Sequence, residues 1–177
     1  MKKKHGIFHN ILLYSVFLLY VAVLLTLLFM KRHSFRSYNF IPFHSIMDYL
    51  FNDNIIVRSF AFSNLIGNVI LFVPLGGYIT LFNSDKGLRK NLLWVFIFSV
   101  SAEIIQYALM VGVADVDDVI LNCLGGFIGI IVYRFLLVIF KDPKKVRYAI
   151  EIIAPAVGIL FFLTIFLYNH QFTTFAL

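Results

Sequence analysis

Five long apolar stretches, separated by shorter polar segments, dominate the sequence. Each has about the 20 apolar residues that a helix needs to cross a bilayer. The connections between them are mostly short, which predicts antiparallel neighbours in one bundle. We therefore predict an all-α integral membrane protein, with 1–177 forming a single membrane domain of about five transmembrane helices. The predicted spans are about 7–30, 59–82, 92–113, 119–140 and 148–168.

Two segments need separate interpretation. The longest connection, 31–58, carries the element Asn39-Phe-Ile-Pro42-Phe43, whose aromatic residues and proline favour the membrane interface. The run from Ile7 to Met30 follows three lysines, as a secretory signal would. It exceeds the roughly 7–15 residues of a signal core, so we expect it to be retained as the first span.

Composition narrows the class of protein. Hydrophobic residues make up 61% of the 177, which is too many for a soluble domain of this length. The net charge of +6 comes from short basic runs between apolar stretches, which indicates membrane topology and not nucleic-acid binding. The single cysteine, Cys123, excludes an internal disulfide. The histidines are scattered and no phosphate-cradling glycine loop occurs, so we expect no metal and no cofactor.

Basic residues also predict the orientation of the spans. The N-terminal segment and two connections must share one side of the membrane and together hold ten lysines and arginines, whereas the opposite side holds four. The positive-inside rule places the richer side, and the N-terminus, in the cytoplasm, and the C-terminus outside. The ten are Lys2, Lys3, Lys4, Lys86, Arg89, Lys90, Lys141, Lys144, Lys145 and Arg147, and the four are Lys31, Arg32, Arg36 and Arg58.

With this orientation, three spans carry polar residues at similar depth toward the outside. Residues three or four apart share a helix face, so each span presents its polar groups on one side. Charged and amide groups are costly in lipid, which favours a common interior or an outward-facing groove. The three sets are Asn64 and Asn68; Glu103 and Gln106; and Asp118 and Asn122, in line with Gly125 and Gly129.

Several of these residues have a structural alternative. The two asparagines would suffice as hydrogen-bonded bridges between helices, and Gly125 and Gly129 as a close-packing face. Glu103 is a functional candidate because it is an intramembrane carboxylate, although a bond to a neighbouring amide or to Arg58 would make it structural. Glu151, near the cytoplasmic boundary, is explained by a local pair with a neighbouring charge.

The aspartates that precede the fourth span, Asp115, Asp117 and Asp118, have three interpretations. They form a solvated loop, they bind a hard divalent cation, or they orient a cationic or hydroxyl-rich ligand together with Glu103 and Asn122. A carboxylate pair would also suit acid–base chemistry. Their spacing alone does not specify a metal site.

Three ordered motifs resemble the VanZ-like family. They are Asn64-Leu-Ile-Gly-Asn68 with Phe72-Val-Pro74-Leu-Gly76, then Ser101-Ala-Glu103-Ile-Ile-Gln106, then Asp115-Val-Asp117-Asp118 with Asn122-Cys-Leu-Gly125-Gly126. The Asn39–Phe43 element is similar to the family's short motif before the second span. The resemblance covers about 39–133.

The resemblance implies a small multi-pass protein of the bacterial cell membrane. The family's namesake is associated with low-level resistance to the glycopeptide teicoplanin in Gram-positive bacteria. The family's polar positions correspond here to Asn64, Asn68, Glu103, Gln106, Asp115, Asp118 and Asn122. Many relatives carry an arginine in the turn before the aspartates, where this chain has Gly112-Val-Ala114. Arg58 would then have to supply the neutralising cation, or the site is more acidic.

Three functions remain open at this stage. The first is a cell-envelope accessory protein whose outward polar groove binds a membrane lipid, a cell-envelope precursor or glycan headgroup, or a membrane-protein partner. The second is a membrane enzyme that acts on an envelope lipid or polymer, with Glu103 and Asp118 as acid and base. The third is a transporter component with Glu103 as a proton-linked group.

The charge distribution generates a test of topology. Reporter fusions should place the 83–91 and 141–147 loops in the cytoplasm, and the 31–58 loop, the 112–118 turn and the C-terminus outside. A cysteine introduced at Ser84 should be protected from an impermeant thiol reagent added to intact cells. External labelling of that cysteine would contradict the orientation and the outward-facing groove with it.

Overall fold

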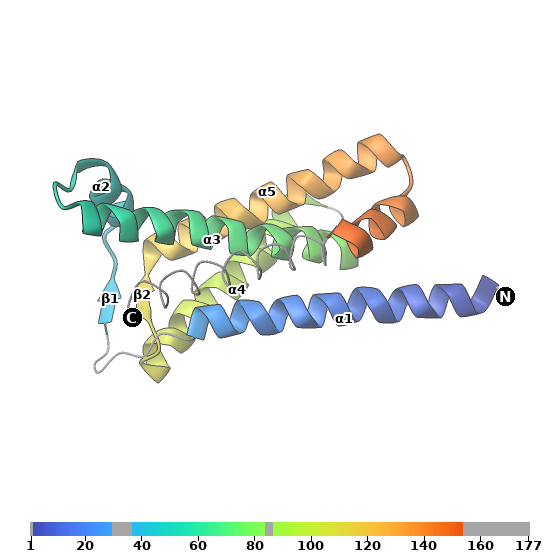
Figure 1. Ribbon diagram of the computed structural model, residues 1–177, viewed down its shortest axis with the longest axis horizontal. Helices are drawn as coiled ribbons and strands as arrows, with labels where there is room; N and C mark the ends of the chain where they lie inside the picture. The colour runs from blue at the N-terminus through green and yellow to red at the C-terminus, as the bar shows by residue number, and fades with distance from the viewer. Residues whose placement is uncertain (1, 30–36, 84–86, 154–177) are drawn as a thin grey trace, which may run out of the picture. The chain divides into compact units, whose positions relative to one another are not determined.

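The computed structural model describes residues 2–29, 37–83 and 87–153, and most of them are helical (Figure 1). Four helices are long and apolar enough to cross a membrane, which confirms the predicted helical membrane fold. The predicted fifth span, 148–168, lies mostly outside the described residues. The elements are α1 (Lys2–Phe29), β1 (Ser37–Asn39), α2 (His44–Phe51), α3 (Ile55–Phe82), α4 (Leu88–Leu109), β2 (Val113–Asp115) and α5 (Val116–Phe140), and a further helix occupies 143–153.

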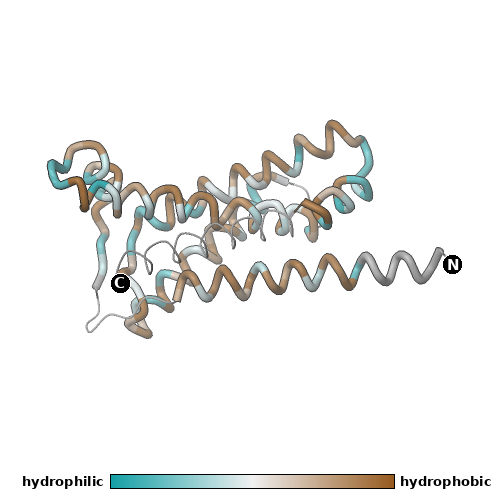
Figure 2. Tube along the Cα trace, viewed as in Figure 1, coloured by the Kyte–Doolittle hydropathy of each residue, from teal (hydrophilic) through white to brown (hydrophobic). Residues whose placement is uncertain are grey.

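Hydrophobic residues continue along α3, α4 and α5, while hydrophilic residues gather around α2 and after α5 (Figure 2). Large apolar side chains such as Phe60, Trp94 and Phe135 are more than half exposed on these helices. A soluble protein would bury them, whereas a lipid bilayer solvates them. The chain is therefore a multi-pass membrane protein.

The chain divides into two compact units. The unit Val23–Ile139 contains α2 to α5, both strands and the end of α1. The described residues before and after it, 2–22 and 140–153, belong to the other. In that second unit Glu151 is buried and pairs with Arg147 at 3.2 Å, as expected for a local ion pair.

Glycines bring α3 and α5 into backbone contact. A Cβ added at Gly125 would overlap the carbonyl oxygen of Val69, and one at Gly129 would overlap that of Val73. Gly76 of α3 meets the Gly126 carbonyl in the same way. The prediction that Gly125 and Gly129 face a neighbouring helix is confirmed, and that helix is α3. Such small residues allow helices in lipid to approach closely enough for extensive van der Waals contact.

A short parallel strand pair, absent from the sequence prediction, joins the long connection to the turn before α5. Ser37, Tyr38 and Asn39 of β1 lie opposite Val113, Ala114 and Asp115 of β2. The third span accordingly ends at Leu109 and not near 113, because Met110 adopts a left-handed conformation (φ 55°) that terminates α4. Glu103 and Gln106 therefore lie in the last two turns of α4, nearer its end than predicted.

Buried polar groups also occur where α3 ends and α4 begins. Asn91 donates to the Thr80 hydroxyl at 3.1 Å and accepts from the Asn83 amide at 2.7 Å. Both Asn91 and Thr80 are fully buried. These bonds join the end of α3 to the start of α4.

The glycine contacts generate a stability prediction. Gly129→Ala should destabilise the protein by about 1–3 kcal/mol, since the new methyl group has to displace the α3 backbone. Gly67→Ala is the matched control, because a Cβ there meets nothing within 4 Å. Gly67→Ala should leave the stability unchanged or raise it slightly, because alanine has a higher helix propensity than glycine. Thermal unfolding in mild detergent measures both, and equal melting temperatures would contradict the close contact.

Candidate ligand-binding groove

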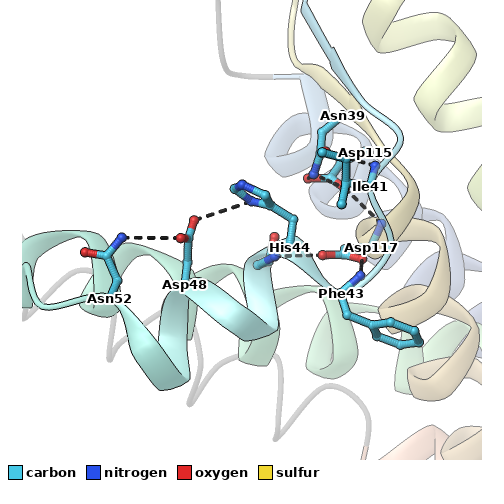
Figure 3. A network of polar contacts seen from close by, with 9 residues as sticks. Asn39, Ile41, Phe43, His44, Asp48, Asn52, Asp115 and Asp117 are labelled. Atoms are coloured by element: carbon cyan, nitrogen blue, oxygen red, sulfur yellow. Dashed lines mark hydrogen bonds and ion pairs between the residues drawn. The ribbon is translucent and has the colours of Figure 1, made fainter.

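Asn39 and Asp115, opposite each other in the strand pair, hold β1 and β2 together through their side chains. The Asn39 amide donates to both carboxylate oxygens of Asp115, each at 3.2 Å (Figure 3). The side-chain Oδ1 of Asn39 accepts from the Ile41 N–H at 3.1 Å, and this bond turns the chain after β1. Asp115 also accepts from the Asp117 N–H at 2.9 Å, at the start of α5. The Asp115 carboxylate thus joins its own strand, β2, to β1 and to the start of α5.

Asp117 supplies the N-terminal cap of α2. Its carboxylate accepts from the N–H groups of Phe43 and Ser45, the latter at 2.8 Å (Figure 3). Phe43 has a φ of 65°, and no side chain of α2 itself caps the helix. A carboxylate at a helix N-terminus satisfies N–H groups that lack helical partners and interacts favourably with the helix dipole. Asp117 is 2% exposed, so it positions the connection and does not face solvent.

Glu103 links α4 to the strand pair. It is 6% exposed, and one carboxylate oxygen accepts from the Asp115 N–H at 2.9 Å. A buried carboxylate requires hydrogen-bond donors to offset its loss of hydration. This bond therefore anchors β2 to the last turns of α4.

A groove with a volume of about 430 Å³ lies beside this network. Its walls are aromatic and aliphatic, and Glu103 and Asp115 contribute its two carboxyl groups. Such a combination of apolar walls with few polar groups is typical of ligand sites. The lining residues are Tyr38, Phe40, Val100, Glu103, Ile104, Tyr107, Ala114, Asp115, Val116 and Val119.

Burial raises the pKa of Asp115 above its ordinary value, and the charge of Asp117 acts in the same direction. The hydrogen bonds from the Asp117 N–H and the Asn39 amide, and the nearby His44, oppose the rise. Desolvation penalises the charged form of an acid, whereas donors and cations favour it. A positive charge entering the groove would lower this pKa again.

The other predicted site residues lie in the same unit but form separate pairs. Asn64 donates to Asp118 at 2.8 Å and accepts from Asn68 at 3.5 Å, which joins α3 to α5. Asn122 donates to the Ser99 hydroxyl at 2.9 Å, and Gln106 donates to the Leu28 carbonyl at 2.8 Å. Of the predicted residues, Glu103 and Asp115 line the groove together, whereas the others form hydrogen bonds elsewhere in this unit.

Arg58, the predicted cation for the aspartates, bonds to the backbone of α2. Its Nε donates to the Tyr49 carbonyl at 3.0 Å, and its side chain is exposed. His44, which approaches Asp115 closely enough to affect its pKa, also pairs with Asp48 at 3.4 Å. The basic side chain that acts on Asp115 is therefore that of His44, which α2 brings to this place.

Three further residues were absent from the predicted site. Asp117 was considered with Asp115 and Asp118 but was not among the predicted ligand-binding residues. Its role is to cap α2, a helix that was not predicted from the sequence. Asn39 was seen only as part of an interfacial element. Ser99 lies seven residues before Gln106, on the face of α4 that carries Glu103, and that spacing was its available signal.

Comparisons with known proteins place this multi-pass membrane fold in a family. A model of the VanZ/LLP1 family matches residues 11–141, more than half of the chain, and the chain belongs to that family. Over 72 residues it is 36% identical to Protein VanZ of Enterococcus faecium. This match covers 41% of the chain and 45% of the relative, so it spans less than half of that protein. No solved structure matches.

The cap on α2 generates a prediction. Asp117→Asn should destabilise the protein by about 1–3 kcal/mol, because one acceptor oxygen becomes an N–H donor that faces backbone N–H groups. Limited proteolysis between 37 and 54 should accelerate. Asp53→Asn, at an exposed position between α2 and α3, is the control and should leave both quantities unchanged. Wild-type protease resistance in Asp117→Asn would show that the cap does not hold this segment.

Proposed function

We propose that this protein is a cell-envelope accessory protein of the bacterial membrane, whose groove binds an envelope ligand and lowers sensitivity to teicoplanin-type glycopeptides. The groove carries the proposal, since it combines a buried carboxylate, Glu103, with apolar walls at the ends of two membrane-length helices. Membership of the VanZ/LLP1 family supports the link to glycopeptides.

Location supports the choice of ligand. The groove lies where α4 ends and α5 begins, and the positive-inside rule assigns this end to the outside. Envelope lipids, glycan precursors and glycopeptides meet at that membrane surface. A site there has access to these molecules and not to the soluble cytoplasmic steps of precursor synthesis.

Binding explains the geometry better than the enzyme alternative does. An acid–base pair has to reach one substrate together, within hydrogen-bond distance. Glu103 lines the groove, but Asp118 does not, and it accepts instead from Asn64. The enzyme hypothesis would need a different partner for Glu103.

Expression in a susceptible Gram-positive host tests the proposal. The minimum inhibitory concentration should rise more for a glycopeptide that carries an acyl tail, such as teicoplanin, than for one without a tail. Glu103→Gln should abolish the rise, because it removes the buried charge at nearly constant volume. Immunoblotting of membranes should show that the variant is present in normal amounts.

The variants Asp118→Asn and Asp53→Asn complete the experiment. The first changes a carboxylate that bridges α3 and α5, and the second changes an exposed one outside the groove. Asp118→Asn should also abolish the rise while the protein stays in the membrane, whereas Asp53→Asn should protect as the wild type does. Equal protection by Glu103→Gln would show that the groove carboxylate does not contribute to the phenotype.

A further inference from the structure

We infer that the groove recognises a membrane phospholipid whose headgroup ends in a primary ammonium, with the carboxylates receiving the ammonium and the apolar wall of α4 receiving an acyl chain. This inference rests on the proposed function, because it names the chemical class of the envelope ligand. Charge, aromatic contacts and the direction of the apolar wall support it.

The polar part of the lining selects for positive charge. Glu103 and Asp115 accept hydrogen bonds from backbone N–H groups, and Asp115 accepts two more from the Asn39 amide. Donors of this kind favour the ionised carboxylate. An ammonium offers three donors and an opposite charge, and such charge-assisted bonds are stronger than neutral ones. A headgroup that carries negative charge without a cation would meet repulsion from both carboxylates.

The aromatic wall favours the same ligand. Tyr38 stacks on Phe40 with ring centroids 5.0 Å apart, and it meets Tyr107 edge-on at 6.4 Å. All three residues line the groove beside the carboxylates. Aromatic faces attract ammonium groups through the negative potential above the ring. This second contribution is independent of the hydrogen bonds.

The apolar wall identifies a lipid and not a soluble amine. Val100, Ile104 and Tyr107 line the groove from successive turns of α4, at spacings of four and three residues. At 1.5 Å per residue they span about 10 Å, from near the helix end toward its membrane-embedded centre. Ile104 is 63% exposed, so this wall is open to the surrounding lipid. A phospholipid would place its headgroup beside Asp115 and a chain along this wall.

Lipid binding to the full-length protein in mild detergent tests the inference. Native mass spectrometry would compare dioleoyl phosphatidylethanolamine with its N-acetylated form, which keeps both chains and the phosphate but lacks the ammonium. The unmodified lipid should bind about tenfold more tightly, as one strong charge-assisted contact requires. Soluble phosphoethanolamine, the headgroup without chains, should not compete at the same concentration.

Two variants separate the roles of charge and shape. Glu103→Gln should lower the affinity for phosphatidylethanolamine to that for the N-acetylated lipid. Ile104→Trp should weaken both lipids, because the larger side chain fills the apolar wall and leaves the carboxylates unchanged. Asp53→Asn should bind as the wild type does. If Glu103→Gln fails to fold, Ile104→Trp and the pair of lipids still decide the question.

Equal affinity of the wild type for the two lipids would overturn the inference, as would unchanged binding by a folded Ile104→Trp variant. Competition by phosphoethanolamine would show that the groove recognises a soluble amine and not a lipid. Ammonium-selective binding without any change in glycopeptide sensitivity would refute the proposed resistance and leave the lipid assignment in place. The two failures are therefore distinguishable.

Discussion

The hydrogen bond between the Asp115 N–H and the buried Glu103 carboxylate is the interaction on which the candidate site depends. It fixes β2 against the last turns of α4, and the Asp115 side chain then holds β1 through Asn39. Asp117, two residues on, caps α2 from the start of α5. Three carboxylates therefore organise β1 and α2 of the long connection together with β2 of the turn before α5. Because each accepts backbone N–H groups, burial of these acids is compensated by bonds that also determine the path of the chain.

The glycine contact between α3 and α5 provides the rigid support for this arrangement. Backbone approach at Gly125 and Gly129 brings α3 close to the helix that carries Asp117 and Asp118 at its first turn. The Asn64–Asp118 bond extends the same interface toward the helix ends. Apolar surfaces give little net driving force between helices in lipid, so close packing and interhelical hydrogen bonds hold the bundle. The polar residues of the family motifs thus divide into those that bind helices together and those that border the groove.

That division accounts for the many buried polar groups of this membrane protein beside its candidate groove. Asn68, Gln106 and Asn122 are nearly or completely buried and donate to other groups of the bundle. Glu103 is buried as well, but it also borders the groove, where the aromatic residues of β1 and the apolar face of α4 meet. The proposed ligand combines a charged headgroup with an acyl chain, whose solvation requirements differ, and the two kinds of lining would suit one part each.

The sequence by itself determined the membrane class, four of the helical spans to within a few residues and the packing face of Gly125 and Gly129. These properties follow from composition and from the helical repeat, which relate residues only a few positions apart. The tertiary structure decided the strand pair, the cap on α2, the bond of Arg58 to Tyr49 and the choice of Asp115, not Asp118, as the partner of Glu103 in the groove. The bonds from Asn39 to Asp115 and from Phe43 to Asp117 join residues 76 and 74 positions apart. No periodic pattern encodes such pairs, because they depend on where the long connection returns to the bundle.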